Sequence, residues 1–118
     1  MFKVIVAGGR DFNNYKLLEY KLDALLINKE KSEIVIISGM AKGADSLALI
    51  YAEKNNLKVE KYAADWDQYG KSAGYKRNQQ MADNANALIA FWDGQSRGTK
   101  HMIDIATKAK LQVRVISY

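Results

Sequence analysis

Three stretches of the sequence combine glycine with small polar and basic residues, a combination that can hold phosphate groups. They read AGGRDF at 7–12, SGMAKGAD at 38–45 and WDGQSRGT at 92–99. In the second stretch, Gly39 and Gly43 allow backbone N–H groups to approach an anion closely, and a following helix adds the partial positive charge of its N-terminus. The chemistry that these stretches indicate is the binding of a phosphate-bearing ligand.

A second interpretation of the Gly39 and Gly43 stretch needs no ligand. Its spacing matches neither the dinucleotide-binding G-x-G-x-x-G pattern nor a P-loop, and two glycines also make a tight strand-to-helix turn. In a simple turn Asp45 caps the helix, whereas in a binding site it holds a ribose hydroxyl. Gly98, Thr99 and the N–H groups that open the last helix predict a second anion site across the crevice.

Two side chains in and after the third stretch are candidates for proton transfer. Asp93 is a carboxylate at a strand end and is the candidate general base, unless it only orders the turn at Gly94. His101 is the single histidine of the chain and falls in the first turn of the last helix, where it can donate a hydrogen bond or carry a proton. The alternative for His101 is a partly exposed helix residue without a role in the site.

Aromatic and basic residues gather between positions 63 and 78. Residues 63–72 are predicted as a loop, in which Trp66 and Tyr69 are explained by stacking on a nucleobase. Packing over the sheet edge or in a dimer interface explains them as well. Lys71 and Arg77 bracket the start of a predicted helix and can close over a ligand, or they remain solvated.

These residues need a scaffold that brings their loops to one edge. Strand-type runs are predicted at 1–7, 34–37, 58–62, 87–91 and 113–116, and helical periods at about 14–29, 43–56, 74–85 and 102–109. Five strands alternating with four helices predict parallel strands joined by right-handed crossovers. We therefore expect one domain over residues 1–118, a Rossmann-like three-layer α/β/α sandwich with the strand order 3-2-1-4-5. Ligands of such sheets bind beyond the carboxyl ends of the strands, where the unusual residues gather.

Composition excludes several classes of function. The chain has no cysteine and one histidine, so neither a disulfide scaffold, a thiolate nucleophile nor a zinc or histidine-rich metal site is expected. We expect no secretion signal and no membrane span, and hence a cytoplasmic protein without a membrane partner. The formal net charge of +5, most of it in the second half, suits anionic partners such as nucleotides or nucleic acid.

Four segments together resemble the SLOG superfamily, named for the DNA-processing protein A and Lonely Guy proteins: AGGRDF, SGMAKGAD, ADWDQYGKSAGYKRNQQM and FWDGQSRGTKHMI. Within it the chain looks most like the small stand-alone YspA-type branch, related to YpsA. The resemblance implies a Rossmann-like fold that binds a nucleotide or nucleotide derivative. Members are variously single-stranded-DNA binders, phosphoribohydrolases acting on nucleoside monophosphates, and predicted sensors of nucleotide signals in phage and bacterial conflict systems.

The resemblance also implies roles for particular residues. Residues 8–10 occupy the first motif, where the Arg10 guanidinium would pair with a phosphate. Gly98 and Thr99 stand where Lonely Guy enzymes have the motif Pro-Gly-Gly-x-Gly-Thr-x-x-Glu, but the proline is absent and Met102 replaces the catalytic glutamate. A thioether cannot act as a general acid or base. The phosphate cradle is kept, but the basis for that hydrolase chemistry is in question.

We therefore expect a sensor or processing protein, a homo-oligomer that binds a nucleotide or nucleotide derivative and requires no other cofactor. One alternative is a nucleotide hydrolase, phosphoribohydrolase-like, that uses Asp93 or His101. The other is a single-stranded nucleic-acid-binding protein in which Trp66 or Tyr69 stacks on bases. The residues expected to bind the ligand are Gly8, Gly9, Arg10, Ser38, Gly39, Lys42, Gly43, Asp45, Trp66, Lys71, Arg77, Asn78, Asp93, Gly94, Ser96, Gly98 and Thr99.

Overall fold

A five-stranded parallel sheet forms the centre of the molecule. The computed structural model describes all 118 residues, and its strands are β1 (Phe2–Gly8), β2 (Ile34–Ser38), β3 (Lys58–Lys61), β4 (Ala87–Trp92) and β5 (Gln112–Ser117). Their order is β3-β2-β1-β4-β5, which confirms the predicted α/β fold class and topology. In the central strand β1, Val4 pairs with Ile36 of β2 on one side and with Ala87 of β4 on the other.

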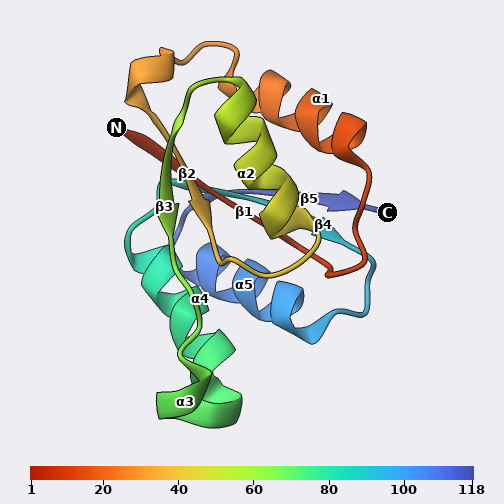
Figure 1. Cartoon of the computed structure of the whole chain (residues 1–118), viewed down its shortest axis with the longest axis vertical. Helices are drawn as coiled ribbons and strands as arrows, with labels where there is room; N and C mark the ends of the chain where they lie inside the picture. Colours follow the sequence, from red (N-terminus) through yellow and green to blue (C-terminus); the bar gives the residue numbers. More distant parts are fainter.

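Helices cover both faces of the sheet. Helices α1 (Tyr15–Leu26) and α2 (Ala44–Lys54) lie on one face, and α4 (Ala73–Asp83) and α5 (Arg97–Lys108) lie on the other (Figure 1). Several bounds differ from the prediction by a few residues, as at α1, which ends at Leu26 rather than near Lys29. None of the helices is long and apolar enough to cross a membrane.

The alternation of side chains along β1 supplies both hydrophobic layers. Val4 and Val6 belong to the cluster under α1 and α2, whereas Ile5 and Ala7 belong to the cluster under α4 and α5. A strand that is buried on both faces reads as a continuous apolar run, as in residues 4–7 of β1, 34–37 of β2 and all of β4. The sheet is therefore a rigid platform whose carboxyl edge carries the loops discussed below.

Residues 63–72 differ from the loop predicted there. They contain the short helix α3 (Trp66–Tyr69) and one turn of 3₁₀ helix at Gly70–Ser72, which lead into α4. The Asp65 side chain caps α3 by accepting a hydrogen bond from the N–H of Gln68, 3.1 Å away. A four-residue helix has no apolar period of its own, and this one buries no side chain, so periodicity alone does not reveal it.

Candidate ligand site at the carboxyl edge of the sheet

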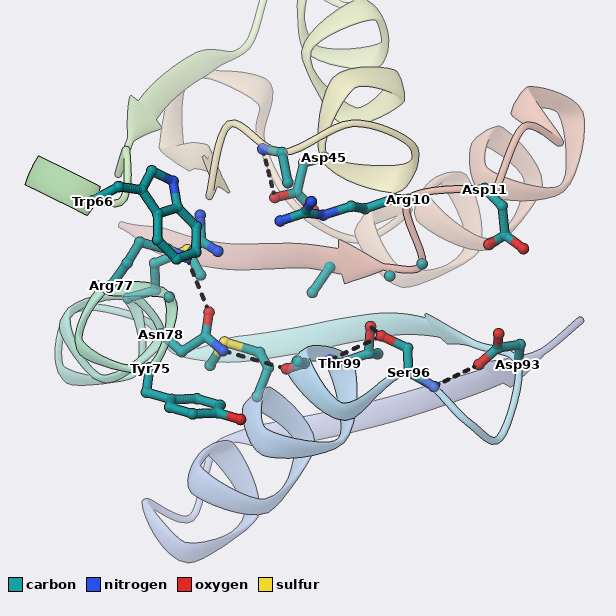
Figure 2. Close-up of a pocket in the computed structure, with 18 of the residues that line it drawn as sticks. Arg10, Asp11, Asp45, Trp66, Tyr75, Arg77, Asn78, Asp93, Ser96 and Thr99 are labelled. Atoms are coloured by element: carbon teal, nitrogen blue, oxygen red, sulfur yellow. Dashed lines mark hydrogen bonds between the residues drawn. The ribbon is translucent and has the colours of Figure 1, made fainter. Parts of the chain in front are cut away.

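A cavity of about 560 Å³ opens where β1 and β4 end, a volume typical of small-molecule sites. The position is a switch point of the sheet, because β2 and β3 lie on one side of β1 while β4 and β5 lie on the other. Figure 2 shows side chains from the loop after β1, the first turn of α2, helix α4 and the start of α5 around this space. The cavity thus lies at the edge where the sequence predicts ligand binding.

Most of the residues predicted for ligand binding line this cavity. They are Gly8, Gly9, Arg10, Asp45, Trp66, Lys71, Arg77, Asn78, Asp93, Ser96, Gly98 and Thr99. Sequence reasoning missed Ala7, Asp11, Ala41, Gly74, Tyr75, Met81 and Met102. Asp11 and Tyr75 could have been predicted, because they are polar or aromatic residues next to motif residues. Alanine and methionine on a cavity wall cannot be distinguished from core residues by residue type alone.

Six of the predicted residues lie off the cavity wall: Ser38, Gly39, Lys42, Gly43, Gly94 and His101. Lys42 and Gly94 are exposed beside it. Ser38 is buried, and its hydroxyl donates to the carbonyl of Asp45 and accepts from the N–H of Met40, both at 3.2 Å. The serine therefore holds the strand-to-helix loop in shape from below.

Gly39 and Gly43 bring protein groups close together. A Cβ atom on Gly39 would lie 2.8 Å from Nη1 of Arg77 and 2.9 Å from Oδ2 of Asp45. Gly43 has a φ of +80°, and a Cβ atom there would collide with the carbonyl oxygen of Gly9. In this structure the two glycines join the loop after β2 to α4 and to the loop after β1, and their contact with a ligand stays a prediction.

Two guanidinium groups line the cavity and form no ion pair within 4 Å. Arg77 donates one hydrogen bond to the carbonyl of Gly39 and another, from Nε, to Oδ1 of Asn78 at 3.1 Å. Both ion pairs of the structure lie elsewhere, so no carboxylate oxygen is within 4 Å of Arg10 or Arg77. Burial lowers the pKa of Arg77, Asp45 opposes this, and the charge of Arg10 adds to the lowering.

Asp45 places a buried carboxylate on the cavity wall beside these arginines (Figure 2). The residue is 6% exposed, and its Oδ2 accepts a hydrogen bond from the N–H of Ala41 at 3.2 Å. Gly43 is the N-cap of α2, so the interpretation of Asp45 as the helix cap is wrong, and its carboxylate closes the preceding loop instead. Burial raises the pKa of Asp45, while the hydrogen bond from Ala41 and the charge of Arg77 lower it in part.

We expect Asp45→Asn to raise the free energy of unfolding at neutral pH. Burial raises the pKa of Asp45 in the folded state, so the protonated carboxyl stabilises the fold in full below the unfolded pKa of about 3.9. This stabilisation is lost as the pH rises through the pKa of the folded state, because the buried carboxyl then carries a charge. Asparagine keeps an oxygen acceptor for Ala41 and buries no charge. Urea denaturation between about pH 4 and 8 measures this, and a less stable variant at pH 7 would contradict it.

Asp93 orders the turn that precedes α5. Its Oδ1 accepts hydrogen bonds from the N–H groups of Gln95 and Ser96 at 2.8 and 2.9 Å. The hydrogen bond from Ser96 is the largest cause that lowers the pKa of Asp93, and the hydrogen bond from Gln95 is the second. A less basic carboxylate is a weaker general base. The geometry thus supports the turn-ordering interpretation, and the catalytic role of Asp93 stays a prediction.

His101 joins α5 to α4 behind the cavity wall. Its Nδ1 lies 3.1 Å from Nδ2 of Asn78, and its ring packs against Tyr75 with centroids 4.5 Å apart. Because the amide of Asn78 donates, Nδ1 is the acceptor and Nε2 carries the proton. Burial lowers the pKa of His101, so the ring is neutral at pH 7. Its catalytic role also stays a prediction.

The start of α5 is capped by the protein itself. Oγ of Ser96 accepts a hydrogen bond from the N–H of Thr99 at 3.4 Å and lies 3.0 Å from the Thr99 hydroxyl. Gly98 remains open, because a Cβ atom on it would meet nothing within 4 Å. Met102 is buried on the cavity wall and offers an apolar surface there. An anion at this helix end would therefore approach beside Gly98.

Tyr118, which follows β5, braces the loop after β1. Its hydroxyl donates to Oδ1 of Asp11 at 2.6 Å, and its ring packs edge-on against Phe12 with centroids 4.9 Å apart. A Cβ atom on Gly9 would collide with the same hydroxyl. The far edge of the sheet thus supports the cavity, although no residue of β5 lines it.

Together, this fold and cavity define a Rossmann-like α/β protein with a small-molecule-sized site at the switch point of its sheet. The chain belongs to the YspA, cpYpsA-related SLOG family, whose model matches residues 2–69, and the predicted superfamily is confirmed. It is 34% identical to the Gene 61 protein of Mycobacterium phage D29 over 121 residues, 96% of this chain and 94% of that protein.

A solved structure has the same fold. The X-ray structure of DNA processing protein A (DprA) from Streptococcus pneumoniae matches with a TM-score of 0.74 at 20% sequence identity. The match covers 97% of this chain and 49% of that one, so this chain spans about half the length of the DprA structure. At this level of identity the likeness shows the shared fold.

Proposed function

We propose that this protein binds a nucleotide or nucleotide derivative in the cavity at the carboxyl edge of the sheet. The observation that carries the proposal is the pair of guanidinium groups of Arg10 and Arg77, which line the cavity with no carboxylate within 4 Å. Arg77 is partly buried and Arg10 is exposed, and phosphate oxygens accept two parallel hydrogen bonds from one guanidinium. A phosphate-bearing ligand would give each guanidinium the charged hydrogen-bond acceptor that it lacks in this structure.

Aromatic side chains at one side of the cavity suit the base of such a ligand. Trp66 and Tyr75 line the wall while remaining 52% and 48% exposed. Large aromatic rings exposed in a cleft gain free energy when a flat partner covers them, and nucleobases stack on them readily. Membership in the SLOG family and the fold shared with a DNA processing protein further support a nucleotide- or DNA-related function.

A thermal-shift screen tests the proposal. Nucleoside mono-, di- and triphosphates, dinucleotides and cyclic nucleotides are compared, and binding stabilises the folded state by about 2.7 kcal/mol at a hundredfold excess over Kd. We expect at least one of these nucleotides to raise the Tm and Arg10→Ala to abolish that shift. The Tm of the ligand-free variant should stay unchanged, because the Arg10 side chain makes no hydrogen bond or ion pair within the protein. Arg114→Ala, on β5 away from the cavity, is the matched control. Equal shifts in both variants would refute the role of Arg10.

A second candidate function is the binding of single-stranded nucleic acid. The observation that favours it is the row of exposed aromatic residues Trp66, Tyr69 and Tyr75 on α3 and α4, with Lys76 over the Tyr69 ring at 4.9 Å. Successive bases stack on such rings, and backbone phosphates would meet the lysines. A steep salt dependence of oligonucleotide affinity, without any shift from mononucleotides or dinucleotides, would favour this function over the first.

A further inference from the structure

A second, smaller hollow of about 150 Å³ adjoins the main cavity. Four residues line both spaces: Arg10, Ala41, Trp66 and Arg77. The two hollows therefore meet along the arginine pair, and the charged groups stand at the boundary between them. A volume of about 150 Å³ is large enough for one six-membered ring.

The walls of the two hollows differ in chemistry. Apart from the shared residues, the smaller hollow is lined by Met40, Ala63, Ala64 and the backbone of Gly39, and no acidic side chain lines it. The main cavity instead carries three carboxylates and several hydroxyl and amide groups. An uncharged ring thus fits the smaller hollow, and a polar sugar fits the larger one.

The boundary between the hollows is held in position before any ligand arrives. Arg77 is fixed by its hydrogen bonds to the Gly39 carbonyl and to Asn78, and the absence of a side chain on Gly39 lets the guanidinium lie against the loop. Trp66 adjoins Arg77 in the same view (Figure 2). A cation held in this way loses little conformational freedom when it binds an anion.

We propose that the site takes a two-part ligand, two nucleosides joined through phosphate, with the bridge against Arg10 and Arg77 and a single-ring base in the smaller hollow. The inference rests on the proposed function and narrows its ligand class from nucleotides in general to phosphate-bridged dinucleotides. A mononucleotide would occupy the main cavity and leave the smaller hollow empty. A 5′–5′ diphosphate and a 3′–5′ phosphodiester both provide such a bridge.

Calorimetric titration with matched probes tests the ligand class. The bridged probes are NADH, with a 5′–5′ diphosphate and an uncharged dihydropyridine ring, and the dinucleoside monophosphate UpA, with a 3′–5′ phosphodiester and a pyrimidine ring. Their halves are AMP, reduced nicotinamide mononucleotide and UMP. We expect at least one bridged probe to bind about tenfold or more tightly than either of its halves, because the second half binds intramolecularly. The bridged probe that binds more tightly shows whether the site prefers a 5′–5′ diphosphate or a 3′–5′ phosphodiester.

A variant that fills the smaller hollow tests the placement. Ala64→Leu should reduce the affinity of the bridged probe to that of AMP and leave AMP binding unchanged, whereas Ala109→Leu, exposed and away from both hollows, should change neither. If AMP binds and neither bridged probe binds more tightly than AMP, the inference is overturned and the proposed function stands. Undiminished binding of the bridged probe to a folded Ala64→Leu variant also overturns it. Absence of binding by every probe, AMP included, overturns the inference, and the proposed function fails with it only if the thermal-shift screen also finds no nucleotide that binds.

Discussion

Replacement of Gly43 by alanine should lower the free energy of unfolding by about 2–6 kcal/mol. The residue has a φ of +80° and a ψ of −127°, a conformation that costs a residue with a side chain about 1–3 kcal/mol. The added methyl group would also press on the carbonyl of Gly9 and the backbone of Arg10, and overpacking of this kind costs about 1–3 kcal/mol more. Urea denaturation measures the loss, which is a large fraction of the stability of a typical domain.

Gly94→Ala separates the two causes. Gly94 also has a positive φ, +86°, but a Cβ atom on it would meet nothing within 4 Å. This control should therefore show the conformational cost alone, about 1–3 kcal/mol. Equal destabilisation of the two variants would show that the close packing of Gly43 against the loop after β1 contributes nothing to stability.

Arg77→Met should weaken binding of the nucleotide found in the screen by about a hundredfold. The substitution removes a partly buried cation from the cavity wall, and the loss of one partner from a desolvated charged hydrogen bond costs about 2–5 kcal/mol. Arg77→Lys keeps the charge and loses the planar fork, so we expect an intermediate affinity. Calorimetric titration of both variants measures the change in Kd.

The ligand-free Tm of each variant is the control for Arg77, because its guanidinium also holds the Gly39 carbonyl. A small decrease in Tm is expected for Arg77→Met, with the fold retained. If the folded methionine variant bound the nucleotide within about threefold of the unchanged protein, well under the 1.4 kcal/mol of a tenfold change, Arg77 would not be a partner of the phosphate.

The fold could be predicted from the sequence because its signals are long and repeated. β1 and β2 contain the apolar runs 4–7 and 34–37, the helices carry amphipathic periods, and the two types alternate along the whole chain. Such alternation leaves few topologies. Helix α3 escaped prediction because it is four residues long and buries no side chain, so that no pattern of burial marks it; the Asp65 carboxylate caps it by accepting a hydrogen bond from Gln68.

The candidate site was predictable in position and only partly in detail. Arg10, Asp45 and Arg77 come from three separate loops or helices, and the topology brings them to one wall as expected. The partners of each side chain depend on distances that a sequence does not contain. Gly39 approaches Arg77 across 38 residues of chain, and Tyr118 reaches Asp11 across 107. Contacts of this range leave no local pattern in either segment.

The contact between Tyr118 and Asp11 has a consequence for the order of folding. Tyr118 follows β5, and β5 reaches β1 only through β4, so the contact with Asp11 needs all three strands to be in place. The loop after β1 therefore reaches its braced shape only when β5 has joined the sheet. During synthesis, the amino-terminal strands emerge from the ribosome first, yet the cavity wall that they carry is braced by Tyr118 only after β5 has been made. Binding of the proposed ligand should thus report folding of β5 as well as of the amino-terminal half.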